Sequence, residues 1–298
     1  MKKIFFLVFL ALVTPAEAKV TVVTTTTDLA ALVSVVGGQE VAATSIAKGT
    51  QDPHEIEAKP SFMVQVRNAN LVVAQGLELE TAWLLPLIRG ARNPGVNPGS
   101  KGFLELGPSL DPIEKPTGTV SRAEGDVHPG GNPHFQVDPV RMGKAAVIVA
   151  ERLAELDGVH AEFYRKNAAA WQKQLEDKTK SWQARLAKTG IKEAVSYHKT
   201  LSYFFERFGI KNSYQLEPKP GIPPTASHLL EVIAGMKAKK IRLVLIENFF
   251  DSAAGEKIKL SVPDAHIARV PVSVGGEPSI HSTEELVERL VQAVEAAK

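Results

Sequence analysis

A long helical segment in the middle of the chain constrains the fold more than any other feature of this sequence. From Val140 to about Ala187, apolar residues recur at helical spacing among lysine, arginine, glutamate and glutamine. The apolar stripe consists of Leu153, Leu156, Phe163, Tyr164, Trp171, Leu175, Trp182 and Leu186. Asp157-Gly158 is expected to divide the segment, so that its second helix runs from about His160 to Lys188. At 1.5 Å per residue this helix spans about 40 Å, enough to connect two lobes.

Strand and helix patterns alternate on both sides of this segment. Strands are predicted at residues 19–27, 40–46, 71–74, 193–197, 211–215, 242–247 and 267–272. Helices are predicted at residues 61–68, 201–208, 226–239 and 283–297, with another that begins at Leu29 and is capped by Asp28. Residues 94–133 are rich in proline and glycine and are predicted to be mostly irregular surface.

The alternation predicts an α/β fold with two lobes, each a mainly parallel sheet flanked by helices, joined by one long rigid helix. The predicted parts are a signal peptide (1–18), an N-terminal lobe (19–158), a linker helix (159–189) and a C-terminal lobe (190–298). No internal sequence repeat is convincing.

The first residues have the layout of a secretory signal peptide. Lys2 and Lys3 precede an apolar run from Ile4 to Val13, and Ala16-Glu17-Ala18 forms an A-x-A cleavage site. A membrane anchor is the alternative, but such a run covers only about half of a 30 Å hydrocarbon core. The sequence contains no cysteine and therefore no site for a lipid anchor. We expect a soluble, monomeric periplasmic protein.

The charge of the chain argues against nucleic acid as a partner. The formal net charge is only +2, and no run of basic residues is present.

Three histidines occupy similar settings, in loops or just after strands and beside turn-forming residues. They are His54, His134 and His198. In α/β sheets, ligands bind outside the carboxyl ends of the strands, where loops distant in sequence can converge. Neutral imidazole suits zinc and does not select hard, oxygen-seeking ions such as calcium. Taken singly, however, a histidine is more often an ordinary polar residue than a metal ligand.

Several motifs in order resemble one family, the periplasmic solute-binding proteins of ATP-driven zinc and manganese importers. These motifs are Asp52-Pro53-His54-Glu55 with Lys59-Pro60-Ser61, Gly131-Asn132-Pro133-His134-Phe135 with Asp138-Pro139, Tyr197-His198-Lys199 with Phe204 and Phe208-Gly209, and Tyr164, Asn167-Ala168 and Leu175 of the long helix. The resemblance covers essentially the whole predicted mature chain. It implies that His54 and His134 bind the metal from the N-terminal lobe and His198 from the C-terminal lobe. A membrane permease would then be the partner.

The fourth metal ligand is not evident from the resemblance. Many members of the family place an aspartate late in the C-terminal lobe, whereas residues 269–276 contain no carboxylate here. Glu247 is our predicted substitute because it ends a buried strand and points toward the expected cleft. A hydrogen bond from Glu247 to a ligating histidine is an equally good interpretation. Glu277, His281 and solvent are the alternatives.

The remaining histidines are predicted to be ordinary residues. His128 lies in a glycine- and proline-rich loop and is expected to be an exposed loop residue, although a transient metal contact is conceivable. His160, His228 and His266 are expected on the surface.

Three imidazoles favour Zn²⁺ over Mn²⁺, although the sequence leaves the cargo open. An exported zinc hydrolase with Glu55 or Glu217 as general base is the main alternative function. The sequence has neither an H-E-x-x-H pattern nor a G-x-S-x-G elbow to support it. A siderophore, haem or vitamin binder is disfavoured because aromatic residues make up only 6% of the chain.

Overall fold

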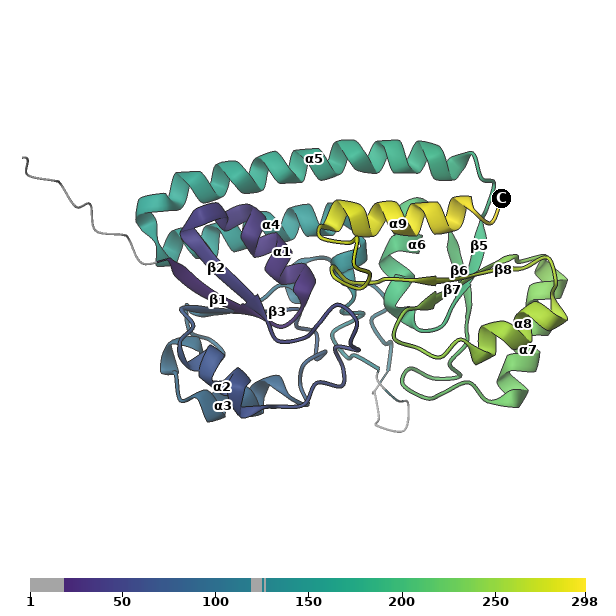
Figure 1. Ribbon diagram of the computed structural model, residues 1–298, viewed down its shortest axis with the longest axis horizontal. Helices are drawn as coiled ribbons and strands as arrows, with labels where there is room; N and C mark the ends of the chain where they lie inside the picture. The colour runs from purple at the N-terminus through teal and green to yellow at the C-terminus, as the bar shows by residue number, and fades with distance from the viewer. Residues whose placement is uncertain (1–18, 119–124, 126) are drawn as a thin grey trace, which may run out of the picture.

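The computed structural model describes residues 19–118, 125 and 127–298. The predicted signal peptide lies outside these residues. Two lobes stand side by side, and one long helix runs along both of them (Figure 1). Within the described part of the chain, no helix combines the length and apolar character that crossing a membrane requires.

The N-terminal lobe is built on a parallel sheet. Its strands are β1 (Val20–Thr24), β2 (Val41–Ser45), β3 (Leu71–Ala74) and β4 (Phe103–Glu105), in the order β2-β1-β3-β4. Successive residues of β1 face opposite sides, so Val22 packs under α1 (Thr27–Gly37), while Val23 packs under α2 (Pro60–Arg67) and α3 (Leu84–Ala91). Both faces are covered, as a parallel sheet requires.

The C-terminal lobe repeats this topology. Strands β5 (Glu193–Ser196), β6 (Lys211–Gln215), β7 (Leu243–Glu247) and β8 (His266–Val270) are parallel in the order β6-β5-β7-β8. Helices α6 (Ser202–Phe208) and α9 (Thr283–Glu295) cover one face, and α7 (Ala226–Lys239) and α8 (Ala253–Ser261) cover the other. The structural repeat therefore exists without a recognisable repeat in the sequence.

The central helical segment forms α4 (Pro139–Leu156) and α5 (Ala161–Ala187), with a short 3₁₀ turn between them. The predicted break and the long helix are both confirmed. The buried face of α5 consists of Tyr164, Ala168, Trp171, Leu175, Thr179, Trp182 and Leu186. Phe163, which we assigned to this stripe, is 40% exposed. It lies one residue, or about 100° of helix rotation, from Tyr164 and therefore stands at the edge of the buried face, next to Gly38.

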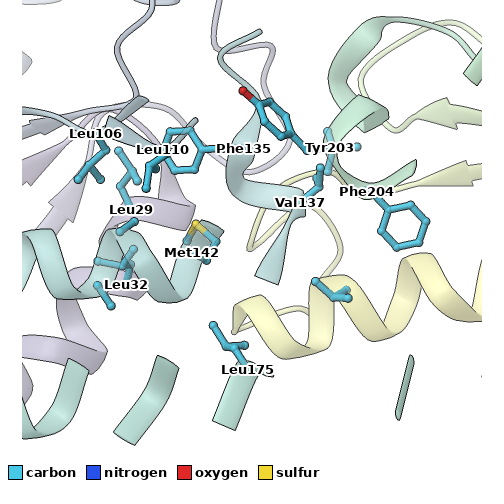
Figure 2. Packing of buried hydrophobic residues seen from close by; sticks show 14 of the residues in the cluster. Leu29, Leu32, Leu106, Leu110, Phe135, Val137, Met142, Leu175, Tyr203 and Phe204 are labelled. Carbon is cyan, nitrogen blue, oxygen red and sulfur yellow. The ribbon is translucent and has the colours of Figure 1, made fainter. Parts of the chain in front are cut away.

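The long helix α5 forms hydrogen bonds or ion pairs with both lobes. Asn167 Nδ2 donates to the Val36 carbonyl of α1 at 3.0 Å. Trp182 Nε1 donates to Glu288 of α9 at 2.8 Å, and Arg185 pairs with Glu288 and Glu295 at 2.7 Å each. Beneath α5, Leu29 and Met142 belong to the same hydrophobic cluster as Tyr203 and Phe204 of the second lobe (Figure 2). The two lobes therefore share a core as well as a helix.

Some elements were not predicted from the sequence. Helix α3 contains Pro86 and Gly90, which disfavour a helix, but Pro86 lies in the first turn, where an N–H is not needed. Strand β4, which has only three residues, was also missed, as was helix α8. The predicted helix cap at Asp28 is wrong: Asp28 lies inside the first turn of α1, and its Oδ1 accepts the Val274 N–H of the other lobe at 2.9 Å.

Candidate metal centre

The three predicted histidines lie together at the junction of the lobes. His54 is in the loop after β2, His134 immediately precedes a 3₁₀ turn before α4, and His198 follows β5. The ring centroids of His54 and His134 are 5.2 Å apart, those of His54 and His198 5.5 Å, and those of His134 and His198 5.4 Å. The loops converge because they leave the carboxyl ends of parallel strands in both sheets.

His128 joins this group, so our expectation of an ordinary exposed loop residue is wrong. Its side chain is partly buried, and its Nε2 lies 3.3 Å from the Nε2 of His54. Its ring centroid is 5.4 Å from that of His54 and 6.3 Å from that of His134. Ligand atoms of His54, His128 and His134 all lie within 4.8 Å of one another, a group that leaves out His198. The only signal in the sequence was its position six residues before His134.

Carboxylates hold two of the rings. His54 Nδ1 lies 2.7 Å from Asp52 Oδ1, and His198 Nδ1 lies 2.7 Å from Glu217 Oε2. Burial alone would raise the pKa of Asp52, but the hydrogen bond and charge of His54 lower it below its ordinary value. A carboxylate on Nδ1 favours the tautomer in which Nε2 carries the lone pair that a metal ion needs. Sequence analysis did not identify either carboxylate as a positioning group.

His134 has no such partner. The residue is 2% exposed, and neither ring nitrogen has a hydrogen-bond partner among the described residues. Burial, followed by the neighbouring His54, His198 and His128, lowers its pKa well below the usual value, so the ring is neutral. Buried polar atoms are rarely left without a partner, and a neutral imidazole nitrogen has the lone pair that a metal ion needs.

Asn132 fixes the backbone around His134 and connects the lobes. Its Oδ1 accepts the His134 N–H at 2.9 Å, and its Nδ2 donates to the Lys199 carbonyl at 2.9 Å. Its own carbonyl accepts the Tyr203 hydroxyl at 2.6 Å. The residue was visible in the sequence only as part of a motif, yet it couples His134 to the segment that carries His198.

Glu247 is placed behind the histidines. It is fully buried, and its Oε1 accepts the backbone N–H of His198 at 3.2 Å. Burial raises its pKa to about 8. Glu247 does not belong to the tight group of ligand atoms, and its role as a ligand stays a prediction. Of the other candidates, Glu277 is paired with Arg289 at 3.2 Å and His281 is exposed.

A small cavity lies among these rings. It has a volume of about 30 Å³, and its lining includes His128, His134 and His198 together with Glu114, Asn132 and Lys199. A cavity of 10–15 Å³ on this measure already holds about one water molecule. The space therefore has room for a single ion or a water.

Two parallel sheets of the same topology, a long helix fastened to both, and a histidine cluster between them define a two-lobed metal-binding protein. Residues 22–295 match the family described as "Zinc-uptake complex component A periplasmic", and the chain belongs to that family.

Similar proteins are known from several bacteria. A putative metal-binding protein of Treponema pallidum is 24% identical, covering 77% of this chain and 72% of the relative. The manganese transporter substrate-binding lipoprotein PsaA of Streptococcus pneumoniae is 25% identical, covering 78% of this chain and 73% of the relative. The zinc-binding lipoprotein AdcA of the same species is 24% identical, but only 46% of its length is matched.

Solved structures share the fold. The crystal structure of ZnuA has a TM-score of 0.77 at 20% identity and covers 94% of this chain and 99% of its own. A cadmium-bound periplasmic metal-binding protein of Candidatus Liberibacter asiaticus has a TM-score of 0.75 at 18% identity, with 94% and 100% covered.

Proposed function

We propose that this protein captures one Zn²⁺ ion in the periplasm and delivers it to the membrane permease of an ATP-driven importer. The observation that carries the proposal is His134, a buried imidazole next to His54 and His198 whose two nitrogens have no hydrogen-bond partner among the described residues. Relatives named for zinc binding and for manganese transport support the role in uptake.

The chemistry of the donor set favours zinc over manganese. Imidazole is a good ligand for Zn²⁺, whereas Mn²⁺ prefers carboxylate and water oxygen. The carboxylates nearest the rings, Asp52 and Glu217, are hydrogen-bonded to Nδ1 atoms of histidines. They therefore support imidazole ligands instead of replacing them.

A hydrolase is less well supported. Of its two candidate general bases, Glu55 is exposed, and Glu217 is engaged with His198 and with the Gly221 N–H at 3.3 Å. A general base must instead be free to accept a proton from a metal-bound water. We therefore propose capture without turnover.

The proposed cellular location of the protein rests on its lack of a lipid-carrying residue. Several relatives are named lipoproteins, whereas none of the 298 residues here is a cysteine that could carry a lipid. We propose a monomer that is free in the periplasm. Cell fractionation tests this, since an anchored protein would sediment with membranes.

Metal analysis of the purified protein tests the function. We expect one zinc per chain, with the metal lost in His54→Ala, His134→Ala and His198→Ala. His228→Ala is the matched control, because His228 bonds the Gln215 carbonyl at 2.9 Å and is no member of the cluster. Wild-type affinity in two of the three variants would overturn the site, and esterase or peptidase turnover would favour the hydrolase.

A further inference from the structure

We propose that His128 is the fourth zinc ligand, so that four imidazoles from both lobes hold the ion and no carboxylate touches it. This inference rests on the proposed function and deepens it by naming the complete ligand set. It also explains how residues 269–276 can lack the carboxylate that the family resemblance implied.

The distance between ring nitrogens fits a zinc site. With Zn–N bonds of 2.0–2.1 Å, two nitrogens of a tetrahedral site lie about 3.3–3.4 Å apart. The Nε2 atoms of His54 and His128 are 3.3 Å apart. Without a metal, this contact is a hydrogen bond if one of the two nitrogens carries the hydrogen. With a metal, the same distance suits two lone pairs directed at one cation.

The ring centroids give a second, independent comparison. Imidazole rings bound through nitrogen to one tetrahedral zinc have centroids about 5.2 Å apart, from the same bond lengths and the size of the ring. The observed separations are 5.4 Å for His54–His128, 5.2 Å for His54–His134, 5.5 Å for His54–His198 and 5.4 Å for His134–His198. His128–His134 is wider, at 6.3 Å. Five of the six pairs of rings thus lie 5.2–6.3 Å apart, and four of these separations are close to the value for rings that share one zinc ion.

The backbone of Leu77 lies near the ring of His128 and partly offsets the lowering of its pKa by burial. Leu77 has φ +54° and Glu78 φ +71°, so this backbone turns through a left-handed conformation that non-glycine residues seldom adopt. A backbone carbonyl on one ring nitrogen is a common support for a ligating histidine. The Leu77 backbone can therefore support His128 as the carboxylates support His54 and His198.

The loop of His128 is also fixed at its two ends. The Gly131 N–H donates to the His128 carbonyl at 3.0 Å, and the Asn132 N–H donates to the Ile113 carbonyl at 2.9 Å. On the other side, Gly125 lies so close to the C-terminal lobe that a Cβ there would stand 2.0 Å from the Pro220 carbonyl oxygen. The loop therefore crosses from one lobe to the other and places His128 over the cavity.

Glu114 lines the cavity, where it is paired with Lys199 and Asn132, and three other carboxylates lie behind the histidines. Asp52 and Glu217 lie on the Nδ1 atoms of His54 and His198, and Glu247 lies on the His198 backbone. Four neutral ligands leave the 2+ charge of the ion intact, and these carboxylates can balance it through the rings.

A cysteine at position 128 gives the sharpest test, because the chain contains no other sulfur ligand of that kind. The zinc-loaded, reduced His128→Cys variant is examined by X-ray absorption, where a thiolate ligand adds a sulfur shell at about 2.3 Å. We expect that shell in His128→Cys and not in His228→Cys, and about four nitrogens at 2.0–2.1 Å in the wild type. A stoichiometric zinc site without sulfur in His128→Cys would overturn the proposal.

Affinity provides a second measurement that does not depend on the cysteine variant folding. His128→Ala should still bind one zinc through three histidines. Its loss of affinity should exceed the about 10- to 100-fold loss that is typical when a hydrogen bond to a ligating histidine is removed. Equal affinity in His128→Ala and wild type, or an oxygen ligand in the wild-type shell, would refute His128 as a ligand. Failure of the wild type to bind zinc would instead refute the proposed function itself.

Discussion

Glu217 Oε2 lies 2.7 Å from His198 Nδ1, and the two side chains are only 4% and 6% exposed. A buried contact of this length fixes both the rotation of the imidazole ring and the nitrogen that carries its hydrogen. The opposite nitrogen is left with its lone pair. Glu217, considered from the sequence as a general base, therefore serves His198 instead.

Removal of this carboxylate should weaken zinc binding without abolishing it. We expect Glu217→Ala to lower zinc affinity about 10- to 100-fold, with Glu217→Gln intermediate because its amide oxygen can still accept a hydrogen bond. Competition with a chelator measures the change, and stoichiometry should stay at one zinc. Glu231→Gln is the control, since Glu231 is 79% exposed and lies 3.9 Å from His228. An unchanged affinity in Glu217→Ala would show that His198 needs no such support.

Zinc affinity should fall from pH 7 to pH 5, but less steeply than four ordinary histidines would require. An imidazole must be neutral to bind, and an unperturbed one has a pKa of about 6.5. Burial lowers the pKa of His128 to about 3 and that of His134 well below its usual value. Both rings are therefore neutral throughout this range and release no proton when zinc binds.

Titration calorimetry in buffers of different ionisation enthalpy counts the protons released. We expect at most about two per zinc from imidazoles at pH 5, because two of the four rings are already neutral. Release of four protons would contradict the burial of His128 and His134. A dissociation constant independent of pH would indicate that carboxylates dominate the site.

Asp28 should destabilise the metal-free protein as the pH rises. Burial raises its pKa from 3.8 to about 7, so the folded state binds the proton more tightly than the unfolded state does. Stability is then lost as the pH rises from about 4 through 7, by about 2–4 kcal/mol at most. The neutral Asp28→Asn variant escapes this loss and keeps an oxygen for the Val274 N–H.

Urea unfolding of metal-free wild type and Asp28→Asn at pH 4.5 and pH 8 measures the difference. The variant should be similar to wild type at pH 4.5 and more stable at pH 8. Asp177→Asn is the contrast, because Asp177 is exposed and paired with Lys173 and Lys180, which lower its pKa. A gain for Asp28→Asn that is the same at both pH values would refute the explanation.

The sequence predicts the fold more completely than the site, for reasons that particular residues make clear. The buried β7 and the long α5 carry strong local patterns, and both were found close to their observed bounds. Strand β4 has three residues and exists only by pairing with β3, so its local sequence carries little signal. Asp28 resembles a helix cap locally, but a backbone N–H from the other lobe binds its carboxylate instead.

Within the site, three histidines were found because each follows a recognisable motif. His128 has no motif of its own, and its place depends on the Leu77 turn, the Asn132 contacts and the approach to Pro220. Such contacts join segments that are distant in sequence, and no local pattern encodes them. Asp52 lies two residues from His54, a spacing that lets its side chain reach the ring, so this contact could have been predicted from the sequence.

The last prediction concerns motion between the lobes. A hinge of extended strands permits wide closure, whereas here the lobes share a hydrophobic cluster and α5 is bound to both. Arg185 pairs with both Glu288 and Glu295, and Trp182 bonds Glu288, so α5 and α9 should move together. We therefore expect nearly superimposable X-ray scattering profiles for the metal-free and zinc-bound protein.

Arg185→Ala should lower the free energy of unfolding by about 1 kcal/mol, since its partners are partly exposed. It should leave the metal-induced change in scattering small. Arg165→Ala is the matched control, because its pair with Glu151 joins α5 only to α4 at 2.7 Å. A decrease of several ångströms in the wild-type radius of gyration on zinc binding would refute the rigid arrangement.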